Sequence, residues 1–231
     1  MQRLVEVPIL MYHYISTPPQ GAGPVRRDLS VPPERFASHL QALHKAGYQS
    51  ISLRTLLDHL TRGAPLPDNP IVITIDDGHT DAYVHAFPLL QEHGLTATFF
   101  VITDFVNEER PEHLSWDQLR EMAAAGMEIG CHSRNHPDFR GKSVDYLVWQ
   151  ALGCKESIEL ELGFHPRFIS YPSGHYDQRT IDVFHSAHYW GGLTSHQGLR
   201  QSSSRPFELM RIRVRGSHTA DDLLYLLSLE W

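Results

Sequence analysis

The sequence has few cysteines, no long apolar run and no excess of positive charge, and each shortage excludes a class of protein. The two cysteines among 231 residues, Cys131 and Cys154, are too few for a disulfide scaffold and lack C-x-x-C spacing. We expect both to be ordinary buried residues, with a disulfide between them as the less favoured alternative. No apolar run approaches the roughly 20 residues of a membrane span, so no transmembrane segment is expected.

The charge balance argues against some binding partners. A net charge of −7 at pH 7 disfavours nucleic acid, because binding to a phosphate backbone requires a basic face. The same total disfavours an anionic polymer, although a local basic patch could override it. The sequence is rich in one chemically useful residue, with sixteen histidines, and His is the commonest metal ligand.

The chain also shows no internal linker and no leader sequence. No stretch rich in Pro, Gly and Ser divides it, so we predict a single domain over residues 1–231. Met1 is not followed by the apolar core of a secretory signal peptide. A removed leader would leave the same sequence, so these residues do not set the location.

Short apolar runs alternate with amphipathic stretches along the whole chain. We expect strands at residues 7–15, 48–52, 71–76, 96–102, 127–131, 168–173, 190–194 and 210–214. We expect helices at residues 33–46, from Ser52 onward, 81–93, between Ser115 and Gly126, 143–162, 177–188 and 221–229, and a loop at residues 26–29. Seven or eight strands alternating with helices predict an α/β fold with a mostly parallel sheet, either doubly wound or closed into a (β/α) barrel.

Polar clusters follow several of these strands, where an α/β fold places its chemistry. His13 ends the first strand, Asp76 and Asp77 end the strand 71–76, and His132 follows the strand 127–131. A Tyr-Pro-Ser-Gly turn at residues 171–174 ends another strand. Ligands and catalytic groups gather at the carboxyl ends of parallel strands, so we predict one site on this rim.

Asp76 and Asp77 are adjacent carboxylates that leave a buried strand. Such a pair is unfavourable unless a cation lies nearby or one of them is protonated. Asp77-Gly78 is also ordinary turn chemistry, so a plain strand-to-turn junction is the alternative. We favour the interpretation that one Asp binds a cation and its neighbour acts as a base.

His132 and His136 supply the remaining ligands for such a cation. Histidines at i and i+4 share one face of a helical turn, so both rings can reach one ion. Such pairs are more often two surface residues, but this one begins directly after an apolar strand. Two His and one Asp leave a position open for water, as a catalytic zinc-like ion requires.

The sequence resembles the polysaccharide deacetylase family of carbohydrate esterases, through Thr-Ile-Asp-Asp-Gly at 74–78 and His-Ser-Arg-Asn-His at 132–136. The resemblance covers nearly the whole chain and implies a distorted (β/α) barrel. It also implies that Asp76 is the catalytic base and that Asp77, His132 and His136 bind the metal. Zinc is the expected ion for this ligand set, with Co²⁺, Ni²⁺ or Mn²⁺ as alternatives.

Further segments are similar to the branch that deacetylates the exopolysaccharide poly-N-acetylglucosamine. These are PILMYHYI at 8–15, YPSGHYD at 171–177, and the later GGLTSHQG and MRIRVRG. The chain departs from better-known members twice: Ser170 stands where an Arg precedes the turn, and no late Leu-x-x-His supplies the general acid. In this branch the acid comes from the first strand, which implies His13, with His218 as the fallback.

The resemblance also assigns residues to the substrate groove. Tyr171, Pro172, Ser173 and Gly174 would form one wall, with a backbone N–H near Ser173 helping to hold the oxyanion. Trp190 would be either a core aromatic residue or a wall of the acetyl pocket.

The implied activity is metal-dependent removal of N-acetyl groups from an N-acetylglucosamine-containing polysaccharide, outside the cytoplasm or in the cell envelope. Two alternatives stay open. One is hydrolysis of another amide or ester, such as acetylxylan or a small cyclic amide. The other is a polysaccharide-binding relative without activity, which retention of the base and all three ligands argues against. The oligomeric state is not predicted.

Overall fold

A curled parallel sheet forms the centre of the protein. The computed structural model describes residues 2–229 and 231. The sheet has eight strands, seven of them in the order β10-β2-β4-β5-β6-β7-β8, with β3 paired to β4. Their bounds are β2 (Ile9–Tyr12), β3 (Gln49–Ser50), β4 (Pro70–Ile75), β5 (Thr98–Val101), β6 (Glu128–Cys131), β7 (Phe168–Ser170), β8 (Gly191–Leu193) and β10 (Ile212–Arg213). Leu193 bridges Leu209, just before β10, so the two edges approach each other and the predicted distorted barrel is confirmed.

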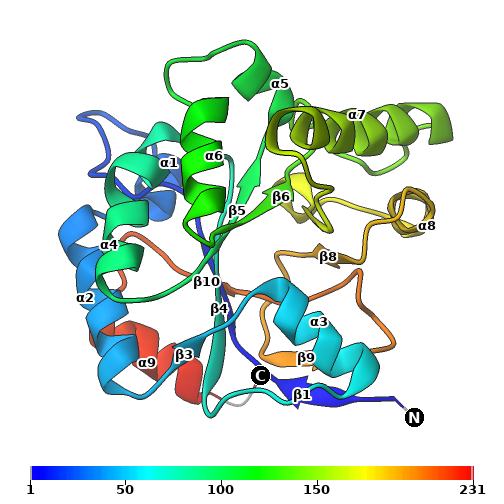
Figure 1. Ribbon diagram of the computed structural model, residues 1–231. Coiled ribbons are helices and arrows are strands. Elements are labelled where there is room, and N and C mark those ends of the chain that lie inside the picture. The colour runs from blue at the N-terminus through cyan, green and yellow to red at the C-terminus, as the bar shows by residue number, and fades with distance from the viewer. Residues whose placement is uncertain (1, 230) are drawn as a thin grey trace.

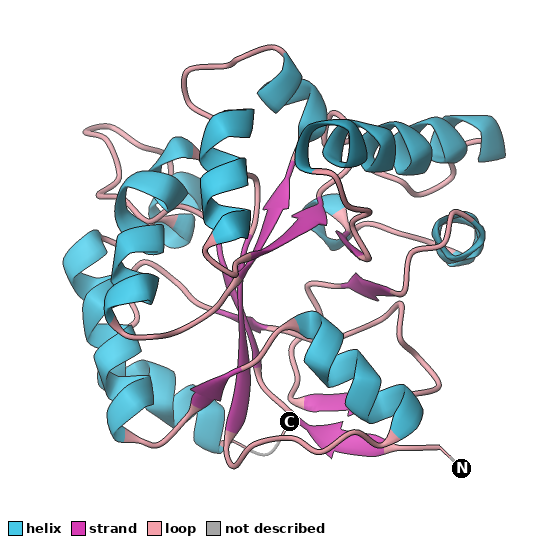
Figure 2. Ribbon diagram, in the orientation of Figure 1, coloured by secondary structure: helices cyan, strands magenta, loops and turns pink. Residues whose placement is uncertain are grey.

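Helices cover the outside of this sheet (Figures 1 and 2). They are α1 (Pro24–Leu29), α2 (Pro33–Lys45), α3 (Leu53–Arg62), a π-helical turn (Ala82–Ala86) continued by α4 (Phe87–Glu92), α5 (Thr103–Asn107), α6 (Trp116–Ala124), α7 (Val144–Leu162), a 3-10 turn (Pro172–Gly174), α8 (Gln178–Ser186) and α9 (Ala220–Ser228). Ser52, Ser115 and Ser143 cap α3, α6 and α7 with their hydroxyl groups. Within the described residues, no helix combines the length and apolar character that crossing a membrane requires.

The two-residue period of the strands decides which side chains face the barrel interior. In β4, Ile71, Ile73 and Ile75 belong to the large cluster that packs against the outer helices. Val72 belongs to the interior cluster, so Thr74 and Asp76, two and four residues later, continue its inward face. The same alternation places His13 and His132 inward, one residue after the outward-facing Tyr12 and Cys131.

Helix α3 closes the barrel at the end away from the predicted rim. Its Leu53, Leu56, Leu57 and Leu60 pack against the interior cluster that includes Phe100 and Phe168. Gly130 makes room inside the barrel, because a Cβ there would lie 2.4 Å from the Phe100 ring. The interior is therefore apolar at the end closed by α3, and the polar residues at the carboxyl ends of the strands lie at the opposite end.

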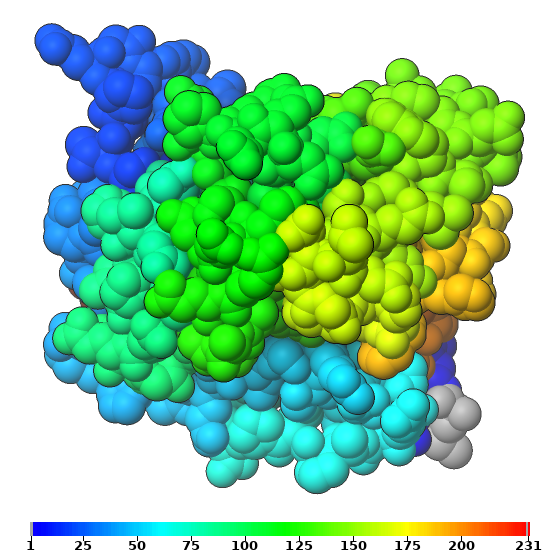
Figure 3. Space-filling model, turned by 45° about the horizontal axis from the view of Figure 1, so that its top comes forward, coloured from blue at the N-terminus to red at the C-terminus, as the bar shows by residue number. Residues whose placement is uncertain are grey.

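The structure differs from the sequence prediction mainly where a helix or strand buries few side chains, because such an element leaves no apolar pattern in the sequence. Residues 26–29 are not a loop but part of α1, which buries none of its side chains and starts with Pro24 at its first turn. This segment projects from the surface in Figure 3, in dark blue at the upper left. The first sheet strand is shorter than predicted, and a separate two-stranded sheet pairs β1 (Leu4–Glu6) with β9 (Arg200–Ser202).

The expectation of two unpaired cysteines is wrong, because Cys131 and Cys154 form a disulfide. Cys131 ends β6 on the outer face of the sheet, and α7 lies over that face with Cys154 buried beneath it. The two Cα atoms are 6.2 Å apart, within the ordinary span of a disulfide. The bond therefore ties the strand that precedes His132 to the longest helix.

Breaking this disulfide should lower stability without unfolding the protein. The bond closes a loop with a sequence separation of 23, for which the entropy of loop closure corresponds to ~3 kcal/mol. We expect Cys131→Ser/Cys154→Ser to lose about this much free energy of unfolding in urea titration. Reductant should lower the wild type to the level of the variant and leave the variant unchanged. Equal stability of the oxidised wild type and the variant would contradict the assignment.

Candidate functional site

The strand ends carry the predicted site residues to a single cavity. This cavity has a volume of about 190 Å³, and His13, Asp76, Asp77, His132 and His136 all line it. They follow β2, β4 and β6, whose carboxyl ends meet at the same rim. The structure thus brings together residues up to 123 positions apart, from His13 to His136.

Asp77, His132 and His136 lie close enough to share one cation. One ligand atom from each lies within 4.8 Å of the others. The Nε2 atoms of His132 and His136 lie 3.1 and 3.6 Å from Asp77 Oδ1. His132 Nδ1 lies 2.7 Å from the carbonyl oxygen of Ser170, which fixes the ring and leaves Nε2 facing Asp77. This donor set fits a divalent transition metal.

The convergence of the two histidines arises from a turn rather than from helical spacing. Residues 132–136 form no helix. Ser133 and His136 both adopt left-handed backbone conformations, with φ of 69° and 59°, and the Ser133 hydroxyl accepts a 2.8 Å hydrogen bond from the His136 N–H. Asp77 is also left-handed, with φ of 73°. The prediction of a shared ion site assumed helical spacing, which is wrong, although the predicted side chains do converge.

Asp76 is held by a buried arginine that sequence analysis missed. Arg211 Nη1 donates to Asp76 Oδ1 at 2.9 Å, and its Nη2 lies 2.9 Å from Oδ2. Both residues are at most 2% exposed. The Ser170 hydroxyl donates to Asp76 Oδ2 and accepts from Arg211, each at 3.0 Å. The Arg211 Nε donates to the carbonyl of Thr194 at 2.8 Å, which fixes the guanidinium plane.

The position of Arg211 explains why Ser170 can stand where relatives in the resemblance carry an arginine. The guanidinium reaches the carboxylate from just before β10, and the smaller Ser170 side chain leaves the space that it occupies. The available signal was the alternating segment MRIRVRG, which was assigned to a strand and to the family resemblance but was given no role at the site. Its contact partner lies 135 residues away in sequence.

The charges around Asp76 and Asp77 keep both carboxylates ionised. Burial raises the pKa of Asp76, but Arg211 and then His132 outweigh it, so this pKa lies below its ordinary value. Burial also raises the pKa of Asp77, yet the nearby His132 and His79 rings outweigh it and bring this pKa well below the ordinary value. Burial, followed by the charge of His132, lowers the pKa of His136 to about 4, so its ring is neutral and able to bind a metal.

His13 presents a buried ring nitrogen at the same cavity. Its Nδ1 has no hydrogen-bond partner among the described residues. Burial lowers the pKa of His13, and the nearby Asp77 and Asp76 carboxylates partly oppose this shift. An unpartnered buried nitrogen beside two carboxylates is costly unless a ligand or proton engages it.

The Tyr-Pro-Ser-Gly turn forms one wall of the cavity, as predicted. Tyr171, Ser173 and Gly174 line it, and the buried Pro172 starts the 3-10 turn. Ser173 has a φ of 55°, and a Cβ on Gly174 would lie 2.0 Å from the Ser195 Oγ. The turn therefore needs glycine at this position to pack against the segment after β8.

Two predicted residues lie elsewhere. Trp190 packs against the interior cluster next to α3, with the Arg167 guanidinium 4.3 Å from its ring centroid. Trp190 comes just before β8 and so lies at the amino end of this strand, near α3 and away from the rim; the core alternative therefore describes it, and its assignment to the substrate site is wrong. His218 lines a neighbouring cavity rather than that of Asp76, and accepts a hydrogen bond from the Arg215 N–H. The geometry favours His13 over His218 beside Asp76.

A further aromatic and histidine cluster borders the site and was also missed. Tyr14 stacks on His79 with ring centroids 3.9 Å apart, and His113 lies 5.0 Å from His79. His79 Nε2 lies 3.6 Å from Asp77 Oδ2. The signal was the sequence Asp-Asp-Gly-His at 76–79, which places a fourth histidine near the carboxylates, after His13, His132 and His136.

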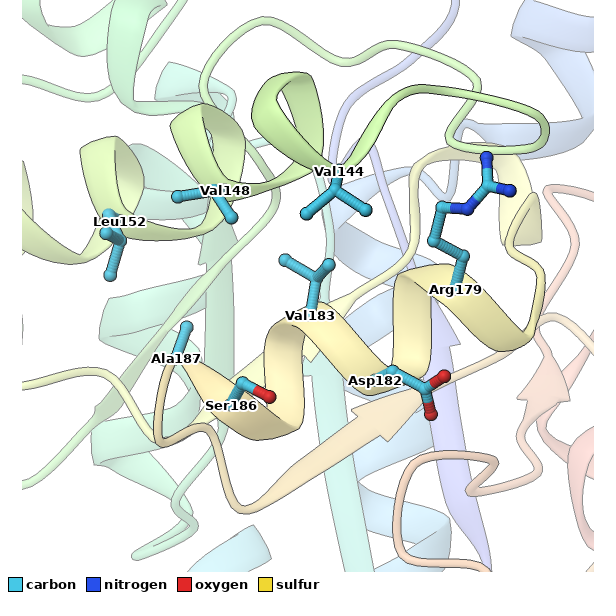
Figure 4. Close-up of a pocket in the computed structure, with 8 residues that line it drawn as sticks. All are labelled: Val144, Val148, Leu152, Arg179, Asp182, Val183, Ser186 and Ala187. Carbon is cyan, nitrogen blue, oxygen red and sulfur yellow. The ribbon is translucent and has the colours of Figure 1, made fainter.

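A larger cavity of about 490 Å³ lies between α7 and α8 (Figure 4). Its walls are largely apolar and include Val144, Val148 and Leu152 from α7 and Val183 from α8. Arg179 belongs to its edge and donates to the Lys142 carbonyl at 3.0 Å. The cavity lacks the grouped carboxylate and imidazole side chains that hydrolysis requires, so the chemistry belongs to the smaller cavity.

Comparisons with known proteins agree with this geometry. Residues 63–191 match the family described as Polysaccharide deacetylase. YxkH of Bacillus subtilis, named as a polysaccharide deacetylase, is 30% identical over 92% of this chain and 73% of its own length. The poly-β-1,6-N-acetyl-D-glucosamine N-deacetylase of Staphylococcus aureus is 24% identical over 81% of this chain and 69% of its own.

The fold comparison gives the same family. The deacetylase PplD of Streptococcus pyogenes, solved in complex with acetate, superposes with a TM-score of 0.90 and 28% identity over 98% of this chain and 100% of that chain. Together with the family match over more than half of the sequence, this likeness identifies the chain as a member of the polysaccharide deacetylase family.

Proposed function

We propose that this protein is a metal-dependent hydrolase that removes N-acetyl groups from an N-acetylglucosamine-containing polysaccharide. The observation that carries the proposal is the approach of Asp77, His132 and His136 to one another beside the ion-paired Asp76. Three ligands from two chain segments and a separate carboxylate are what metal-assisted hydrolysis requires. The name of the S. aureus relative supports N-acetylglucosamine as the sugar.

The metal triad suits zinc best, and Co²⁺, Ni²⁺ or Mn²⁺ would also fit an Asp-His-His ligand set. Such an ion, when bound, would lower the pKa of a water molecule toward ~7 and so make it a usable nucleophile near neutral pH. The chain's own contribution is to hold neutral His136 and ionised Asp77 in place and to keep His132 oriented through Ser170.

Asp76 is the proposed base. Its carboxylate is ionised by Arg211 and lines the cavity next to the metal triad, so it can accept a proton from the attacking water. Arg211 is saturated by Asp76, Ser170 and Thr194, which makes it a positioning residue rather than a group that meets substrate. The bidentate contact fixes the carboxylate in one orientation.

His13 is the proposed acid, and the turn at Ser173 is the proposed oxyanion site. Burial lowers the pKa of His13, and the two carboxylates beside it partly offset this shift; a proton on its ring can be delivered to the leaving sugar amine. A backbone N–H at Ser173, in the wall opposite, can stabilise the developing oxyanion. The products are a glucosamine unit and acetate.

The proposed substrates lie outside the cytoplasm or in the cell envelope, where such polymers occur. Acetylxylan, a small cyclic amide and a binding role without turnover are the competing assignments. The same base and ligand set would serve the first two. Only direct comparison of substrates separates them.

We expect purified protein to release acetate from N-acetylglucosamine oligomers, and to release more from them than from acetylxylan or a cyclic amide. A chelator should abolish release, and added Zn²⁺ or Co²⁺ should restore it, because the nucleophile depends on the ion. The measurement is acetate produced over time by a coupled assay. No acetate from any substrate with metal present would leave only the binding alternative.

Two variants distinguish a loss of metal binding from a loss of turnover. Asp76→Asn should retain the ion, measured by elemental analysis, while turnover falls ~100-fold or more through loss of the base. His132→Ala should lose both, with metal affinity reduced by more than the ~10- to 100-fold typical of supporting residues. Full activity of Asp76→Asn would mean that another group is the base.

Arg211→Met should damage both stability and turnover, because it leaves Asp76 buried without its partner. Removing one member of a buried ion pair costs ~3–5 kcal/mol, which urea titration would measure. Asp76→Asn in the same chain should recover part of this loss. We expect kcat to fall and KM to change little, since Arg211 is not expected to touch substrate. Additive stability losses in the double variant would show that the pair is not coupled.

His13→Ala should lower kcat by ~100-fold or more if its ring supplies the proton to the leaving amine. Metal content should be unchanged. The matched control is His218→Ala, at a histidine that lies in the neighbouring cavity. Near-normal turnover of His13→Ala together with a large loss in His218→Ala would transfer the acid role to His218.

A further inference from the structure

Three arginines at alternate positions lead from the catalytic carboxylate to the mouth of the barrel. Arg211, Arg213 and Arg215 occupy one face of the segment around β10, while Ile212 and Val214 face the outer helices and are buried there. The exposed fraction of the arginine side chains rises along this row, from 1% for Arg211 to 37% and then 51%. Arg211 serves Asp76, but the proposed reaction gives the other two no role.

Arg213 joins the catalytic cavity to a second one. The second cavity has a volume of about 420 Å³ and shares Arg213 and Ser195 with the cavity of Asp76. Its remaining polar lining includes Arg215, His218 and Gln197, and no Asp or Glu lines it within the part of the chain that the structure describes. A polymer that places an acetamido group at Asp76 can therefore extend past Arg213 into a basic recess.

One carboxylate lies against these arginines and neutralises part of their charge. Asp28 of α1 accepts from Arg215 at 2.8 Å and lies 3.9 Å from Arg213. Among the described residues, Arg213 makes no closer side-chain ion pair, and its backbone N–H is held by Gln197. Arg35 adds a further positive charge nearby by donating to the carbonyl of Gly216. Asp222, whose charge acts on His218 of the lining, is a second carboxylate near the recess. Among the described residues the three arginines outnumber these two carboxylates, so the recess is net positive, with the Arg213 guanidinium able to bind a ligand.

We propose that Arg213 and Arg215 form a subsite for an anionic group, a carboxylate or a phosphate, on a sugar next to the one that loses its acetyl group. The inference rests on the proposed deacetylase function and adds a substrate class to it. Two residues of a strand span ~6.6 Å, so Arg213 is displaced from Arg211 by a distance comparable to one sugar ring. Guanidinium groups recognise carboxylate and phosphate through paired hydrogen bonds.

This subsite reconciles the composition of the chain with an anionic substrate. The net charge of −7 disfavours an anionic polymer in general. The electrostatic potential inside a cleft depends mainly on the charges that line it, however, and the lining here is basic. The subsite would select for an anionic group at one position of the polymer, while the rest of the protein surface would still repel anionic polymers.

The test compares three oligosaccharides with wild-type enzyme loaded with Zn²⁺: a neutral N-acetylglucosamine tetramer, and the same tetramer carrying either a carboxylate or a phosphate on the flanking residues. We expect kcat/KM for at least one anionic tetramer to exceed that of the neutral one, and salt to reduce this advantage. The anionic tetramer with the larger gain in kcat/KM over the neutral one identifies which group, carboxylate or phosphate, the subsite binds. Arg213→Gln should lower the ratio of anionic to neutral kcat/KM by ~10-fold or more, the value of one charge-assisted contact.

Arg213→Lys should recover part of the ratio, because it restores charge without the planar fork. Arg62→Gln is the matched control, at an exposed arginine on α3 at the closed end of the barrel, and should leave the ratio unchanged. Equal kcat/KM for all three tetramers, or an unchanged ratio in Arg213→Gln, would overturn the subsite while the deacetylase proposal stands. Absence of acetate from every tetramer would instead overturn the proposed function.

Discussion

The buried pairing of Arg211 with Asp76 is the interaction on which the arrangement of the rim depends. Two adjacent carboxylates at the end of a buried strand repel each other and lose hydration, so burial alone would protonate one of them. Arg211 offsets this for Asp76, and the histidines do so for Asp77. The guanidinium comes from the last part of the chain, so Asp76 is fully supported only when β10 has joined the sheet beside β2. Closure of the barrel and ionisation of Asp76 are therefore one structural event.

The inward face of the barrel separates apolar support from chemistry along each strand. Val72, Thr74 and Asp76 follow one another on the inside of β4, from the cluster over α3 to the rim. β6 and β7 repeat this change with Gly130 before His132 and Phe168 before Ser170. Because the outward residues of the same strands pack against helices, a strand cannot slip by one residue without burying its charged end in the apolar layer. The Cys131–Cys154 disulfide adds a covalent constraint next to His132.

Features with local causes were predictable from the sequence, and features that depend on distant partners were not. The capping serines and the apolar strand 71–76 gave the helix starts and the strand that carries Asp76 nearly as observed. The approach of Asp77, His132 and His136 to one another could be predicted because these residues lie in recognisable short segments. Arg211 was missed since its partner is remote, and Trp190 was misplaced because it precedes β8 and lies at the end of this strand that faces α3, opposite the rim. The expectation of unpaired cysteines was wrong because the disulfide depends on how α7 crosses β6. The expectation of a loop at residues 26–29 was wrong because α1 has no buried face that would mark it in the sequence.

The backbone at the rim shows where the fold has accepted strain to assemble the site. Within the described residues, four of the seven non-glycine positions with positive φ are Asp77, Ser133, His136 and Ser173. Each such conformation costs ~1–3 kcal/mol unless its surroundings compensate. If the strands simply continued beyond the rim, Asp77 and His136 would not point toward His132. The left-handed turns at Asp77 and His136 reverse the chain locally and direct both side chains toward it. The stability supplied by the apolar barrel below, and by the disulfide behind β6, is what allows these turns to persist above it.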